Sequence, residues 1–225
     1  GEIYNYIELR QMLIRNGHIF KTDSDTEVIV HLFEEKGAEC VSALNGMFAF
    51  TVWDNLKKEL FVFRDRIGIK PLYYTIDDHS FTFASHLLSI CKVRPNKDIS
   101  FESFLNYLGI SYVPYPETIF KDICKLEPGH FLKVKKNGQI INTKYWDIKE
   151  FGTLDLPSIE DYRDRIMGLL KDSISIQKRS DVAVGTFLSG GIDSSCIVAL
   201  LSEQLEEPVR TFSAGFEGGL NELPY

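Results

Sequence analysis

A short loop rich in serine and glycine is the part of this sequence best suited to chemistry. It reads Ser189-Gly190-Gly191-Ile192-Asp193-Ser194 and lies between a strand-like stretch, residues 182–188, and a helix-like stretch, residues 193–205. Glycines let backbone amides approach a ligand closely, and the start of a helix adds unpaired N–H groups and the positive end of a dipole. We therefore expect this loop to bind an anion.

The residues directly after the loop narrow the kind of anion chemistry. The P-loop ends in Gly-Lys-Ser/Thr and supplies a lysine to the outer phosphates of ATP, but no such ending is present here. A different mode of phosphate binding is therefore expected. The alternative is a simple Ser/Gly turn in which Asp193 only caps the helix.

Charged residues in the first half of the chain allow a functional and a structural interpretation. Asp25 lies at a predicted helix start, where aspartate often acts only as a cap, and Glu2 could be a solvated charge. The cluster Arg64-Asp65-Arg66 could be a set of surface ion pairs, and we expect Arg64 and Asp65 to be structural. The four cysteines form no CxxC pair and the five histidines show no ligand spacing, so neither a zinc site nor a disulfide framework is predicted.

Apolar residues at helical spacing predict two short helices near the start of the chain. The first covers residues 4–15 and ends at Asn16-Gly17, and the second begins at a cap, Ser24 or Asp25, and ends at Gly37. Runs of β-forming residues then predict three antiparallel hairpins. Their strands cover residues 47–53 and 59–64, 72–76 and 80–84, and 130–135 and 139–145.

The pattern changes after Trp146. Residues 151–157 have the composition of a linker, and Ser158 with Asp161 resembles a capping box that opens a long helix. The next elements come in the order strand, loop, helix, strand, ending at residues 209–212, which is the order of a parallel α/β sheet. Two parallel strands cannot bury both faces of such a sheet, so we expect the second domain to be cut short.

Composition excludes several classes of partner. The chain has 225 residues, of which 44% are hydrophobic and 25% charged, as in an ordinary globular protein. Its net charge of -7 and scattered lysines form no basic stripe, and no apolar run approaches the roughly 20 residues that span a bilayer. We expect no nucleic acid, no membrane segment and a cytoplasmic location.

Because the chain starts at Gly1 and stops directly after a strand, we expect an internal fragment.

The Ser/Gly loop resembles the SGGxDS loop of the ATP pyrophosphatase superfamily, whose members split ATP into an adenylated substrate and pyrophosphate. The resemblance implies that the backbone of Leu188 and Ala214 receives the adenosine and that Mg²⁺, with unknown protein ligands, accompanies the phosphates. It also implies that five residues hold the departing pyrophosphate: Ser189, Gly190, Gly191, Asp193 and Ser194.

The first part of the chain is similar to the class II glutamine amidotransferase domains of asparagine synthetases. Four segments carry the likeness in order and spacing: residues 1–5, 23–25, 46–50 and 64–74. The resemblance implies that Gly1 supplies an oxyanion-hole amide, that Glu2 helps to grip glutamine and that Asp25 pairs with the glutamine α-ammonium. The nucleophilic cysteine would lie upstream of Gly1, so no catalytic residue is expected within this chain. Two departures from the family pattern are His86, where a glutamate is usual, and Ala183, where a proline is frequent.

Together these likenesses imply a two-domain α/β and α+β chain. Residues 1–147 would be the C-terminal part of an Ntn-type α/β/β/α glutaminase sandwich, and residues 148–225 the start of a parallel α/β ATP pyrophosphatase domain. The family makes asparagine from aspartate, ATP and glutamine-derived ammonia through β-aspartyl-AMP, and a homodimer is compatible with it. Two alternatives stay open: amidation of another carboxylate in surface-polymer synthesis, and a non-catalytic relative of the same fold.

Overall fold

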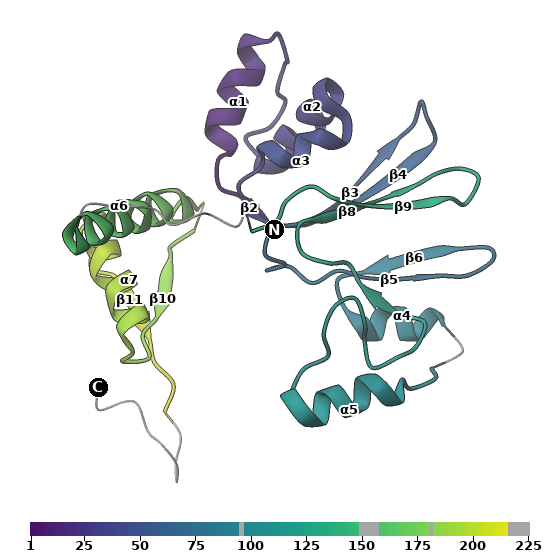
Figure 1. The fold of residues 1–225 in the computed structure, drawn as a ribbon. Coiled ribbons are helices and arrows are strands. Elements are labelled where there is room, and N and C mark those ends of the chain that lie inside the picture. Colours follow the sequence, from purple (N-terminus) through teal and green to yellow (C-terminus); the bar gives the residue numbers. More distant parts are fainter. Residues whose placement is uncertain (95–96, 149–157, 181, 216–225) are drawn as a thin grey trace. The chain divides into compact units, whose positions relative to one another are not determined.

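The computed structural model describes residues 1–94, 97–148, 158–180 and 182–215 (Figure 1). The chain divides into two compact units, Gly1–Lys149 and Glu150–Tyr225, which are described one at a time. Residues 151–157, the predicted linker, lie outside the described part.

Three helices form one outer layer of the first unit. They are α1 (Tyr6–Arg15), α2 (Asp25–Lys36) and the short α3 (Cys40–Ala43), which comes after a 3₁₀ turn, η1 (Gly37–Glu39). The Ser24 side chain accepts a hydrogen bond from the Thr26 N–H, so Ser24 is the N-cap of α2 and Asp25 is its first helical residue. Gly17 and Gly37, with φ of +97° and +57°, end the two helices where the sequence predicts.

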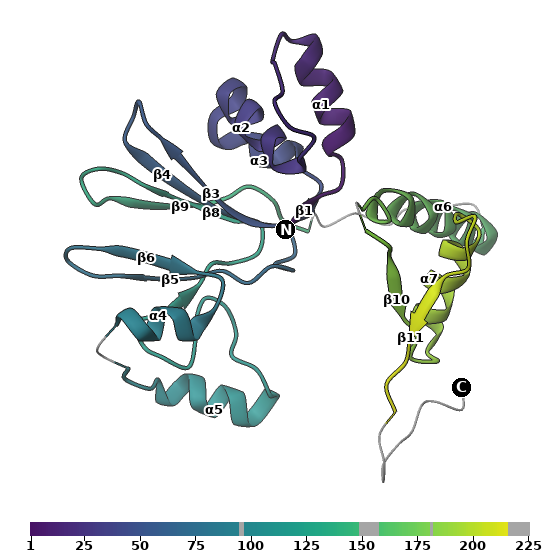
Figure 2. The ribbon, with the colours of Figure 1, turned by 180° about the vertical axis from the view of Figure 1, so that it is seen from behind.

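Two antiparallel sheets form the middle layers of this unit, as Figures 1 and 2 show from opposite sides. One sheet has the strand order β3-β4-β8-β9 and the other the order β6-β5-β7. The three predicted hairpins are confirmed as β3–β4, β5–β6 and β8–β9. The strands are β3 (Ala49–Asp54), β4 (Glu59–Arg64), β5 (Tyr73–Ile76), β6 (Phe81–Ala84), β7 (Cys124–Lys125), β8 (His130–Val134) and β9 (Ile140–Lys144).

Elements between the second and third hairpins were not predicted. Helices α4 (Leu87–Val93) and α5 (Phe101–Ile110) cover the outer side of the second sheet, which completes an α/β/β/α order of layers (Figure 1). A two-residue pair, β1 (Glu2–Ile3) with β2 (Gly46–Met47), lies outside the two large sheets.

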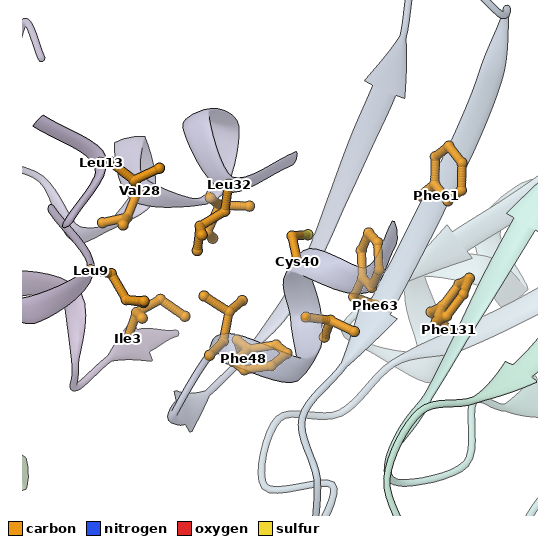
Figure 3. Close-up of a cluster of buried hydrophobic side chains, with 13 residues drawn as sticks. Ile3, Leu9, Leu13, Val28, Leu32, Cys40, Phe48, Phe61, Phe63 and Phe131 are labelled. Atoms are coloured by element: carbon orange, nitrogen blue, oxygen red, sulfur yellow. The ribbon is translucent and has the colours of Figure 1, made fainter. Parts of the chain in front are cut away.

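Strand β4 is buried on both faces because it lies between two cores. Phe61 and Phe63 point into the cluster beneath α1–α3, where they lie beside Phe131, and Phe61 also packs against Phe33 of α2 (Figure 3). Val62, the residue between them, belongs to the second cluster, which lies between the sheets. The alternation results from the two-residue period of a strand, although both faces are apolar here.

Buried charge stands at the end of β4. Arg64 and Asp65 are 4% and 0% exposed, so the interpretation of this cluster as surface ion pairs is wrong, whereas the expectation that the two are structural is confirmed. The Asp65 carboxylate accepts from the backbone N–H groups of Phe48, Ile69 and Lys70 at 3.2, 2.8 and 2.9 Å.

The neighbouring Arg64 donates hydrogen bonds to backbone carbonyl groups, whereas Asp65 accepts from backbone N–H groups. Its guanidinium donates to the carbonyls of Lys70 (2.8 Å) and Gly68 (2.9 Å), and also to that of Leu126. The Arg64 carbonyl in turn accepts from the Tyr145 hydroxyl at 2.7 Å. Adjacent side chains thus join segments that are far apart in the sequence.

The second unit contains α6 (Ile159–Gln177), β10 (Gly185–Phe187), α7 (Ile192–Ser202) and β11 (Arg210–Phe212). Ser158 caps α6 by accepting from the Asp161 N–H, and β10 pairs with β11 in parallel, as the sequence predicts. The observed β10 and α7 are shorter than expected. In the described part of the chain, no helix combines the length and the apolar character needed to cross a membrane.

We predict that Asp65→Ala lowers the free energy of unfolding by at least about 3 kcal/mol, because it leaves three backbone donors without their charged acceptor. Urea unfolding followed by tryptophan fluorescence reports on the first unit, since Trp53 and Trp146 both lie there. The matched control, Asp78→Ala in an exposed turn, should change stability by less than about 0.5 kcal/mol. Equal stabilities for the two variants would contradict the role given to Asp65.

Candidate functional site

Strand β1 brings the first candidate residues to the start of α2. The Ile3 N–H donates to Asp25 Oδ2 at 2.8 Å, which fixes Glu2 and Gly1 beside this carboxylate. A Cβ on Gly1 would lie 2.6 Å from the Met47 carbonyl oxygen, so only glycine fits this close approach. The three residues proposed for glutamine binding, Gly1, Glu2 and Asp25, are therefore neighbours.

Asp25 has a structural task that the sequence did not indicate. The capping alternative is wrong because Ser24 is the cap, and the Asp25 carboxylate instead anchors β1 to α2. Its other oxygen accepts from the Thr26 hydroxyl at 3.2 Å. A carboxylate offers about four lone-pair positions, so Asp25 retains acceptor capacity toward a ligand.

The segment before Asp25 is held by Glu27. This carboxylate accepts from the backbone N–H groups of Lys21 and Thr22, both at 2.7 Å. The hydrogen bond from the Thr22 hydroxyl, and after it that from the Lys21 N–H, lowers the pKa of Glu27 to about 2. The helix start that presents Asp25 is therefore fastened by an ionised side chain.

The thiols of the first unit are poorly suited to nucleophilic catalysis. Burial raises the pKa of Cys40 to about 12 and also raises the pKa of Cys124, while Cys91 is 6% exposed. The reactive species is the thiolate, which burial disfavours at Cys40 and Cys124, and Cys91 is too buried for a substrate to reach. None of these three cysteines can stand in for the family's nucleophile.

The second candidate site is the loop between β10 and α7. Gly190 has φ of +82°, a conformation that favours glycine, and the Ser194 hydroxyl lies 3.1 Å from both Ser189 Oγ and the Gly191 carbonyl oxygen. Gly191 is the N-cap of α7 at φ −73°, and Asp193 lies exposed in the first helical turn. The alternative in which Asp193 caps the helix is therefore wrong.

The edge of the parallel pair lies directly beside this loop. The Leu188 N–H donates to the Phe212 carbonyl at 2.9 Å, and the Leu188 carbonyl accepts from the Ser213 hydroxyl at 2.6 Å. Ala214 comes after Ser213 and is exposed. Ligands of open α/β sheets bind at the carboxyl ends of the strands, where Leu188 and Ala214 stand. Because the Leu188 backbone already has partners, only the second lone pair of its carbonyl remains for adenosine.

The two departures from the family pattern have simple surroundings. His86 is the N-cap residue of α4, and its side chain makes no capping hydrogen bond. Ala183 is exposed just before β10.

The histidines give a result that the sequence missed. The structure brings His18 and His31 together, with their Nδ1 atoms 3.1 Å apart. They stand 13 residues apart in sequence, one on a loop and one on a helix, so no regular sequence spacing indicates that they pair. The available signal was His31-x-x-Glu34, since residues three apart on a helix share a face.

Comparisons with known proteins agree with both halves of the chain. The glutamine amidotransferase domain family model matches residues 1–146, and the asparagine synthase family model matches residues 165–225. Asparagine synthetase [glutamine-hydrolyzing] 1 of Bacillus subtilis is 41% identical over 96% of this chain and 34% of its own length. A putative asparagine synthetase [glutamine-hydrolyzing] 2 of Methanocaldococcus jannaschii is 36% identical over 100% of this chain and 44% of its own.

The chain thus spans less than half the length of each of these two relatives. The amidotransferase match covers well over half of the chain, including Gly1, Glu2 and Asp25. The chain belongs to the glutamine amidotransferase domain family, and a segment of asparagine synthase type comes next in the same chain.

Proposed function

We propose that this chain is part of a glutamine-dependent asparagine synthetase, joining the glutaminase domain to the start of the ATP-using domain. The observation that carries the proposal is the order of the two family matches along one chain, which relatives named as glutamine-hydrolysing asparagine synthetases share over nearly its whole length. The domain boundary is proposed at residues 147–148, and the two compact units meet two residues later.

In the glutaminase domain, Gly1, Glu2 and Asp25 would hold glutamine. The exposed backbone at Gly1 would donate to the oxygen that becomes negative when the amide is attacked. Asp25 would pair with the glutamine α-ammonium through oxygen lone pairs that the Ile3 N–H does not occupy. This arrangement binds the substrate by its charged end and leaves the side-chain amide free to react.

In the second unit, the loop from Ser189 to Ser194 would hold the pyrophosphate portion of ATP. Its support is the positive φ of Gly190, the hydroxyl pair Ser189–Ser194 and the start of α7, which together suit an anion. An aspartate carboxylate is a poor electrophile. Its oxygen would attack the α-phosphorus of ATP and release pyrophosphate, and ammonia would then attack the acyl carbon of β-aspartyl-AMP and release AMP.

The loop also has a side chain suited to the metal that accompanies nucleotides. Asp193 offers an exposed carboxylate in the first turn of α7, beside the hydroxyls of Ser189 and Ser194, and oxygen ligands are those that Mg²⁺ prefers. Bound with the nucleotide, Mg²⁺ would offset negative charge on the phosphates. Asp193 is the residue we propose to face it.

We predict that Asp25→Asn in the whole enzyme raises KM for glutamine by about 10- to 100-fold, because the charge-assisted pair with the α-ammonium is lost. An asparagine Oδ1 can still accept from the Ile3 N–H, so the fold should persist. Synthesis supported by ammonia should be unchanged. The control is Asp23→Asn, a carboxylate with 99% exposure. Equal loss with both nitrogen sources would show that Asp25 is only structural.

We predict that the enzyme converts ATP to AMP and pyrophosphate only when aspartate is present. Gly191→Val should lower the rate of AMP formation by about 100-fold, because a branched side chain would stand where backbone approaches phosphate. The substitution suits the fold, since φ is −73° and a Cβ there meets only Ser189 Oγ, at 3.5 Å.

Asp193→Ala should have an effect of the same direction, whereas Ser195→Ala, one residue beyond the loop, should leave the rate unchanged. Chromatographic separation of the nucleotide products shows whether AMP or ADP is formed and at what rate. ADP as the product, or an unaffected Gly191→Val enzyme, would remove this loop from the mechanism.

A further inference from the structure

Three side chains from the α1–α2 loop and α2 bring one possible ligand atom each to within 4.8 Å of one another. His18 Nδ1 and His31 Nδ1 are 3.1 Å apart, and Glu34 Oε2 lies 3.1 Å from the His31 nitrogen and 3.5 Å from the His18 nitrogen. Zn²⁺ bonds of about 2.0–2.1 Å in a tetrahedron separate the ligand atoms by about 3.3 Å. The observed triangle has the size of one face of that tetrahedron.

The far side of each imidazole faces a carboxylate. His18 Nε2 lies 3.1 Å from Glu35 Oε1, and His31 Nε2 lies 3.6 Å from Glu27 Oε1. Metal-binding histidines almost always direct their second ring N–H to such a group, which fixes the tautomer and turns the other nitrogen's lone pair toward the metal. His18 has such a partner at hydrogen-bond distance, whereas His31 Nε2 is buried without a hydrogen-bond partner and only lies near Glu27.

A cation could bind between the imidazole rings of His18 and His31. In the tautomer in which His18 Nε2 donates to Glu35, the Nδ1 atom of His18 is an acceptor that lies beside His31 Nδ1. A metal ion shared by the two Nδ1 atoms and the Glu34 carboxylate oxygen would satisfy these close contacts. The surroundings provide mostly negative charge, because Glu27 and Glu35 flank the same pair.

Packing holds the rings but leaves one side accessible. The imidazoles of His18 and His31 are 19% and 14% exposed, and His31 also packs edge-on against Phe20 at 4.5 Å between ring centroids. Glu34 is 58% exposed. A fourth ligand from solvent can therefore complete a tetrahedron, and two imidazoles favour zinc over the oxygen-seeking Mg²⁺ or Ca²⁺.

We propose that His18, His31 and Glu34 bind a Zn²⁺ ion, with water as the fourth ligand. The ion fastens the loop after α1 to the middle of α2. Its influence reaches the candidate glutamine site, because Glu27 contacts His31 on one side and holds the backbone of Lys21 and Thr22 on the other. The site is structural, and its assignment does not rest on the proposed enzymatic activity.

Metal binding to the full chain tests this assignment directly. After removal of metals with EDTA, titration with ZnCl₂ against a chromophoric chelator should give one tight site per chain. His18→Gln and Glu34→Gln should each weaken binding by at least about 10-fold, and Glu35→Gln by about 10- to 100-fold, because Glu35 is the outer partner of His18. His79→Gln, in the exposed turn between β5 and β6, is the matched control and should bind as the unaltered chain does.

Co²⁺ substitution adds a readout of geometry. A tetrahedral site gives strong visible absorption, which His18→Gln should abolish while circular dichroism shows an intact fold. Zn²⁺ should also raise the Tm of the unaltered chain and of His79→Gln, but not that of His18→Gln. Absence of tight binding, equal affinity in all variants, or the weak spectrum of octahedral Co²⁺ would overturn the proposal. Should His31→Gln fail to fold, the His18 and Glu34 variants still decide it.

Discussion

The fold of the first unit depends on two adjacent buried side chains of opposite charge, which form hydrogen bonds with backbone groups rather than with each other. Asp65 gathers three N–H groups, and Arg64 gathers carbonyl oxygens from two separate loops. Buried charge is costly unless it is fully hydrogen-bonded, so the backbone around Phe48, Gly68 and Leu126 has little freedom to differ. This constraint fixes where β4 ends and where the chain returns toward β8. It also sets the position of β2, the partner of β1 beside the candidate glutamine site.

Local signals explain what the sequence predicts well. Caps, glycines at positive φ and hairpin turns act within a few residues, so the bounds of α1, α2 and the hairpins come from the chain itself. Contacts between distant segments leave no such pattern: β8 lies beside β4, and charged Arg64 and Asp65 are buried although composition suggests a surface. Helix α5 was missed although its apolar residues are as one-sided as those of α1, and most of them are exposed in the structure.

The candidate sites also combine features that the sequence predicts with features that only the structure shows. Motif likeness located the loop from Ser189 to Ser194, and the structure adds that Gly190 needs its positive φ whereas Gly191 does not. Gly190 is therefore needed for the conformation of the loop, whereas the approach of a ligand to Gly191 is part of our proposal. Asp25 combines both in a single side chain, because the carboxylate that we propose to bind glutamine also anchors β1. Sequence reasoning cannot detect such a double role, since the anchored N–H belongs to the backbone.

The place of β4 between β3 and β8 has a consequence for synthesis of the protein in a cell. β3 and β4 leave the ribosome together, but β8, at His130–Val134, is made about 70 residues after β4 and thus roughly 3–14 s later. During this interval Phe61, Val62 and Phe63 have β3 on one side but lack β8 on the other, and that edge of β4 stays open to other chains. Slow translation of residues 65–130 would therefore lengthen the time during which this open edge can pair with other chains.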